Sequence, residues 1–134
     1  MPFIEVRNWP KRPPTPADAM GIKSANFIAW WQTELGCALR RASAMADLPG
    51  VTEDSTTVTF GGPCVVPKDK VLGVIVTGLF DRPDRTKEMR DRLADYLADT
   101  ALQYLSLDWR VEVLVHPFDT EHGPYVSKAV DNNS

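Results

Sequence analysis

The order of apolar and polar residues along this chain predicts four β-strands. The clearest alternation follows Arg110, where Val111, Val113 and Val115 share one side and Glu112 and Leu114 the other. The run from Val71 to Phe80 is almost continuously apolar, which predicts a central strand buried on both faces. In full, the predicted strands are Phe3–Trp9, Ser55–Phe60, Val71–Phe80 and Arg110–Val115.

Two further segments have the period of amphipathic helices. Between about Ser24 and Ala46, apolar residues recur every three or four positions, at Ile28, Trp31, Leu35, Leu39, Ala42 and Met45. A second helix is expected to begin near Asp84 or Thr86, since either side chain can cap a helix start. Its apolar stripe consists of Met89, Leu93, Leu97, Ala101 and Tyr104.

This order of elements is a β-α-β unit repeated twice, over residues 2–60 and 71–130 of one domain spanning 1–134. Both helices must bury an apolar stripe, and one face of a shared sheet provides the surface. The predicted fold is therefore of the α+β class: a four-stranded mixed sheet with two helices on one face.

Composition narrows the classes of function. The 134 residues are 43% hydrophobic and 25% charged with a formal net charge of -3, which argues against nucleic acid as the main partner. There is no apolar run of about 18 residues to span a membrane and no secretory signal pattern, so no membrane role is expected. Cys37 and Cys64 stand in unrelated contexts, and reduced thiols in the cytoplasm are the expectation.

The first candidate for chemistry is Pro2, which directly follows Met1 and precedes the first strand. If Met1 is removed, Pro2 carries a free secondary amine, and burial beside cations lowers the pKa of such an amine from about 8 toward neutrality. It could then act as base, acid or nucleophile. The alternative is that Pro2 is only a rigid start to an edge strand.

The second candidate is the pair Arg82 and Arg85, placed where a buried strand ends and a helix begins. A guanidinium matches a carboxylate in shape, and a nearby helix start adds backbone N–H donors, so the pair suits a small anion. The alternative is two solvated arginines paired with Asp81 and Asp84.

These features resemble the tautomerase superfamily, whose members begin with a catalytic proline and repeat a β-α-β unit. Asp84-Arg85-Thr86-Lys87-Glu88 is similar, at Arg85 and Thr86, to the family's turn into its second helix, and Arg82 with Arg85 resembles the cis-3-chloroacrylic acid dehalogenase branch. Within the superfamily the chain is most similar to that branch and to the 4-oxalocrotonate tautomerase branch. The stretches Trp109–Pro117 and Gly123–Val130 resemble the family's last core strand and its tail.

The resemblance implies a tautomerase that uses no cofactor and acts on small 2-oxo or unsaturated carboxylic acids, with Pro2 as acid and base and Arg82 and Arg85 on the substrate carboxylate. It also implies a homotrimer, which would cover exposed sheet edges. The open alternatives are a cis-3-haloacrylate dehalogenase or hydratase, and a non-catalytic trimeric binding protein that retains Met1.

Three further residues are weaker candidates for substrate contact. Arg110 could reach a substrate, in a neighbouring subunit for example, or be an ordinary exposed strand-start arginine. His122 could line a pocket mouth or sit in a surface turn, and Tyr125, with Trp9 and Phe118, could wall a pocket or be plain core. His116, Glu121 and His122 are too few converging groups for a metal, and no metal site is expected.

Overall fold

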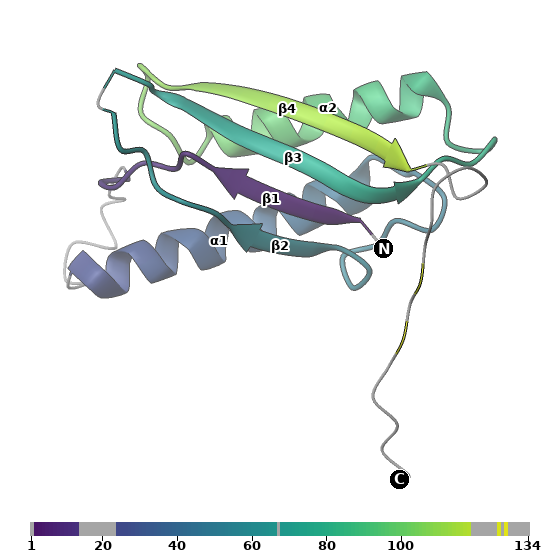
Figure 1. Ribbon diagram of the computed structural model, residues 1–134, viewed down its shortest axis with the longest axis horizontal. Helices are drawn as coiled ribbons and strands as arrows, with labels where there is room; N and C mark the ends of the chain where they lie inside the picture. Colours follow the sequence, from purple (N-terminus) through teal and green to yellow (C-terminus); the bar gives the residue numbers. More distant parts are fainter. Residues whose placement is uncertain (1, 14–23, 67, 119–125, 127, 129–134) are drawn as a thin grey trace, which may run out of the picture.

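The protein forms one four-stranded sheet with two helices packed on a single face (Figure 1). The computed structural model describes residues 2–13, 24–66, 68–118, 126 and 128. In chain order the elements are β1 (Phe3–Arg7), α1 (Ser24–Met45), β2 (Thr57–Phe60), β3 (Val71–Phe80), α2 (Lys87–Leu102) and β4 (Arg110–Phe118).

The sheet has the order β2-β1-β3-β4. β1 and β2 are parallel, β3 and β4 are parallel, and the two halves meet where β1 runs antiparallel to β3. A parallel pair needs a crossover connection, and α1 and α2 each provide one. The predicted fold class is confirmed. Thr86 is the residue that caps α2, because its hydroxyl accepts a hydrogen bond from the Met89 backbone N–H.

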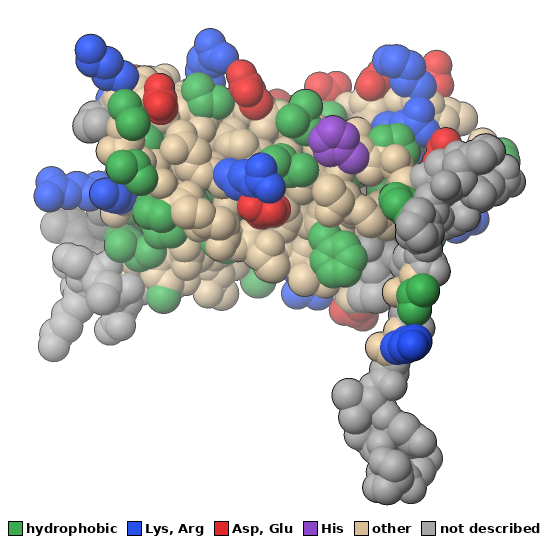
Figure 2. Space-filling view, in the orientation of Figure 1, with side chains coloured by type: hydrophobic (Ala, Val, Ile, Leu, Met, Phe, Trp, Pro, Cys, Tyr) green, Lys and Arg blue, Asp and Glu red, His purple; other side chains and the backbone are tan. Residues whose placement is uncertain are grey.

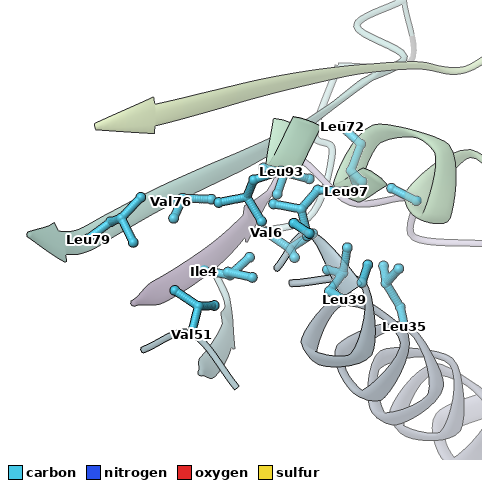
Figure 3. Packing of buried hydrophobic residues seen from close by; sticks show 14 of the residues in the cluster. Ile4, Val6, Leu35, Leu39, Val51, Leu72, Val76, Leu79, Leu93 and Leu97 are labelled. Atoms are coloured by element: carbon cyan, nitrogen blue, oxygen red, sulfur yellow. The ribbon is translucent and has the colours of Figure 1, made fainter. Parts of the chain in front are cut away.

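The core lies between the sheet and the helices (Figure 3). Strand residues alternate, so that Ile4 and Val6 of β1 point toward the helices while their neighbours point away. The largest fully buried side chain is Trp31, whose indole Nε1 donates to the Tyr104 carbonyl at 3.0 Å. The helices contribute Leu35, Leu39, Leu93 and Leu97 to this core.

The prediction that β3 is buried on both faces is wrong for the single chain. Leu72, Val74 and Val76 are buried, whereas Ile75 is half-exposed and Thr77 is exposed. Both helices cover the same face, so every second residue of this central strand lies on the open side of the sheet. Neither helix, within the part of the chain that the structure describes, has the length and apolar character to cross a membrane.

The predicted apolar stripe of α1 is wrong at its last position. Met45 is 71% exposed, and Ala46, just past the end of the helix, is buried in its place. Asp47 follows with φ of 61°, a left-handed conformation typical of the residue that ends a helix.

Two arginine side chains donate hydrogen bonds to backbone carbonyls of the connection between α1 and β2. Arg92 of α2 donates from Nε to the Ala46 carbonyl at 2.9 Å, and Arg40 of α1 donates from Nε to the Glu53 carbonyl at 3.0 Å. These contacts hold the connection against both helices, at the end of the sheet where β1 begins.

Leu39→Ala is expected to lower the free energy of unfolding by about 2–5 kcal/mol, because it leaves a cavity under the sheet. Met45→Ala, on the same helix, is expected to change it by less than about 0.5 kcal/mol, since that side chain lies in solvent. Urea unfolding followed by circular dichroism measures both. Equal losses would contradict the packing of α1 described above.

Candidate active site

Pro2 lies buried at the start of β1. Its carbonyl accepts a hydrogen bond from the Thr57 backbone N–H at 3.1 Å, which fixes it beside the start of β2. Phe3 pairs with Thr77, so Pro2 lies next to Gly78 of β3. Gly78 has φ of 70°, and the pairing of β3 with β4 shifts register between Val76 and Leu79, so β3 is irregular beside Pro2.

Arg82 and Arg85 follow the end of β3, and β3 ends where β1 begins because the two strands are antiparallel. The structure therefore brings Pro2 and both arginines to one end of the sheet (Figure 1). The turn at Pro49 and Gly50, between α1 and β2, lies at the same end of the sheet, and Arg85 bonds it directly at the Pro49 carbonyl.

Arg85 is the most tightly held charged residue at this end. It is 8% exposed; Nε and Nη2 donate to the Pro49 carbonyl at 3.0 and 2.7 Å, and Nη1 donates to the Phe80 carbonyl at 2.8 Å. Both acceptors are neutral, so these bonds leave its charge uncompensated. Burial, and secondly the charge of Arg82, lower the pKa of Arg85 below its usual value.

Arg82 is more accessible. Its Nη2 donates to the Asp84 carboxylate at 2.6 Å, and both side chains are 46% exposed. Its Nη1 faces Gly50: a Cβ built there would lie 3.3 Å from Arg82 Nη1 and 3.1 Å from Arg85 Nη2. The two guanidinium groups thus converge on the surface of one glycine.

Sequence reasoning missed the role of Gly50. The residue has φ of 79° and forms the surface on which both guanidiniums converge. A glycine after a helix is too common to point to such a contact. The two arginines also lie more than thirty residues further along the chain, so no local pattern connects them to Gly50.

Of the other candidate residues, Arg110 and Trp9 lie at the opposite end of the sheet, whereas Phe118 lies at the same end as Pro2. Arg110 pairs with Val71, at the start of β3, so within one subunit it lies at the opposite end of the sheet from Pro2, and it bonds Glu112 at 3.1 Å. Trp9 donates from Nε1 to the Gly61 carbonyl at 2.6 Å. Phe118 packs against Phe80 with ring centroids 6.2 Å apart, beside the end of β3.

His122 and Tyr125, together with Glu121, lie outside the described residues. Within the described part of the chain, no group of three or more His, Cys, Asp or Glu side chains is placed to hold a metal ion.

The face of the sheet away from the helices is open (Figure 2). It shows basic and acidic side chains scattered among uncharged surface, without a continuous patch of one sign. Phe3 and Leu114 expose 51% and 54% of their surface; Phe3 precedes the buried Ile4, and Leu114 alternates with the half-buried Val113 and Val115. The open face therefore also carries large apolar side chains.

Comparison with known proteins gives matches in structure alone. No protein-family model and no curated protein sequence matches the chain. The fused 4-OT protein F6, solved as a wild-type asymmetric trimer, superposes with a TM-score of 0.58 at 14% identity, over 92% of this chain and 91% of that one. Pt0534, solved after inactivation by 2-oxo-3-pentynoate, superposes with a TM-score of 0.56 at 15% identity, over 92% and 89%.

This chain has the tautomerase fold. A domain of unknown function from Sebaldella termitidis shares the fold more distantly, with a TM-score of 0.51 at 19% identity over 97% of this chain and 98% of that one. The expected repeat of a β-α-β unit is thus confirmed at the level of the fold. In the tautomerase fold of this chain, the start of β1 and the loop after β3 share one end of the sheet.

Gly50→Ala is expected to destabilise the protein by about 1–2 kcal/mol, because a side chain is strained at φ of 79° and its Cβ would press on both guanidiniums. Gly36→Ala is the matched control: its Cβ would meet Phe60 and Val58 at an ordinary 3.8 Å inside α1, so it should stabilise by about 0.5–1 kcal/mol. Thermal unfolding of both variants measures the difference. Shifts of the same sign would contradict the geometry at Gly50.

Proposed function

We propose that this protein is a cofactor-independent tautomerase that uses the amine of Pro2 as acid and base on small 2-oxo or unsaturated carboxylic acids. The observation that carries the proposal is the placement of a buried Pro2 at the same end of the sheet as two converging guanidiniums. The inactivation of Pt0534 by 2-oxo-3-pentynoate, a 2-oxo carboxylate, supports the same substrate class for a protein of this fold.

The mechanism needs Met1 to be removed, because only then is the Pro2 nitrogen an amine. The substrate carboxylate binds at Arg82 and Arg85, which places a substrate carbon near the Pro2 nitrogen. Neutral Pro2 takes a proton from that carbon, and the electron pair moves into a dienolate whose negative charge the guanidiniums stabilise. The prolinium then returns the proton to a different carbon, and the double bond has moved.

We further propose a homotrimer located in the cytoplasm. Phe3 and Leu114 on the open face give a reason for burial between subunits, and the fused 4-OT protein F6 assembles as a trimer. In such an assembly Arg110, which lies far from Pro2 in its own subunit, could contact the substrate of a neighbour. His122 and Tyr125 remain candidates for substrate contact. No nucleic acid, membrane or metal enters the proposal.

Pro2→Ala is expected to lower the rate of keto-enol conversion of phenylenolpyruvate and 2-hydroxymuconate by at least about a hundredfold, because the general acid and base is lost. Ultraviolet absorbance follows the reaction, and intact mass must show that Met1 is absent from the active protein. A full rate in the variant, or an active protein that retains Met1, would refute the proposed mechanism. Halide release from 3-haloacrylates would instead favour the dehalogenase alternative, which rests on the resemblance of Arg82 and Arg85 to that branch.

Asp84→Asn is expected to lower KM for a carboxylate substrate by about twofold to fivefold, because Asp84 competes with the substrate for Arg82 in an exposed ion pair. Asp91→Asn is the matched control, since it removes the same charge from the exposed Lys87–Asp91 pair of α2, away from Arg82. If both variants change KM equally, the effect is one of net charge and the contact at Arg82 is not the carboxylate site.

A further inference from the structure

The two halves of the sheet are related by an approximate two-fold axis between β1 and β3. The strand order is β2-β1-β3-β4, the two outer pairs are parallel and the central pair is antiparallel. Rotation about this axis therefore superposes β1 on β3 and β2 on β4. Two backbone hydrogen bonds follow the same symmetry. The Pro2 carbonyl accepts from the Thr57 N–H at 3.1 Å, and the Lys70 carbonyl accepts from the Arg110 N–H at 2.9 Å. Lys70 is therefore the counterpart of Pro2.

The segments that follow the two central strands also correspond. After β3 the chain carries Arg82 and Arg85; after β1 it carries Lys11 and Arg12. The turn at Gly50 lies between α1 and β2, and its counterpart at Ser106 lies between α2 and β4. The end of the sheet where β3 begins lies about 30 Å from the candidate active site, along the ten residues of β3. Its segments correspond to those of the candidate active site, and we call it the far end.

A hollow of about 560 Å³ lies at that far end, in the size range of small-molecule sites. It is built from the corresponding segments and from the connection between β2 and β3. Its lining residues are Pro10, Lys11, Arg12, Cys64, Val65, Lys70, Ser106, Asp108 and Trp109.

The lining combines positive charge with an apolar wall. Lys70 bonds the Asp108 carboxylate, whereas Lys11 and Arg12 are exposed and make no ion pair with any residue in the described ranges. The half-buried Trp109 and Pro10 also line the hollow and supply its apolar surface. Two cations and an aromatic side chain that line one hollow suit an anion that carries a flat apolar body.

We propose that this hollow is a second binding site for small aromatic or unsaturated carboxylates, the two-fold counterpart of the candidate active site, and that it binds without catalysing. The nitrogen at the counterpart of Pro2 is the backbone amide of Lys70, which cannot take up or release a proton near neutral pH. The class of carboxylate rests on the proposed function, whereas the hollow and its charges do not depend on it.

The test is a titration of the ¹⁵N-labelled full chain with benzoate, followed by NMR. The protein carries Arg82→Ala to weaken the candidate active site. Benzoate is expected to shift the Trp109 indole N–H and the Lys11 and Arg12 backbone amides, and the double variant Lys11→Ala/Arg12→Ala should weaken this binding at least about tenfold. Benzamide, of the same shape without the charge, should bind at least about tenfold more weakly than benzoate.

Lys68→Ala is the matched control, because Lys68 is an exposed cation of the same β2–β3 connection that does not line the hollow. Absence of shifts at these residues at saturating benzoate, equal binding of benzamide, or equal effects of Lys68→Ala and the double variant would each overturn the proposal. The outcome is separate from the proposed function: a full rate in Pro2→Ala refutes the tautomerase mechanism and leaves this titration unchanged.

Discussion

The buried guanidinium of Arg85 is the contact on which the candidate site depends. It joins the turn after α1, the end of β3 and the start of α2 by donating to two backbone carbonyls at once. Because those acceptors are neutral, the same side chain fixes the shape of this end of the sheet and supplies it with positive charge. A carboxylate in their place would have held the segments equally well but would have cancelled the charge.

The elements of this fold were predictable because helix and strand periods are local properties of the sequence. The two helices and the alternation of β4 follow directly from residue spacing. Two of the wrong expectations concern what lies outside the helix or strand itself. The apolar run of β3 gave no sign that one of its faces stays open in a single chain, and the spacing at Met45 gave no sign that α1 ends there, leaving Ala46 to complete the core.

The candidate site was predictable only in part. Pro2, Arg82 and Arg85 stood out because their chemistry is unusual at a strand start and a strand end. Residue spacing does not show that Arg85 is buried while Arg82 is exposed. Arg85 bonds Pro49, which is far away in sequence, whereas Arg82 bonds its near neighbour Asp84. Gly50 was missed for the same reason: its importance comes from two side chains that tertiary folding brings to it.

The arginine contacts to Ala46, Pro49 and Glu53 also bear on acid tolerance. Surface ion pairs such as Lys70–Asp108, in which the lysine lowers the pKa of the carboxyl group, lose their attraction in acid once the carboxylate takes up a proton. A backbone carbonyl does not titrate and arginine stays charged, so the connection between α1 and β2 keeps its anchors under those conditions. On acidification this protein should therefore lose its peripheral pairs first, while the end of the sheet that holds Pro2 stays assembled.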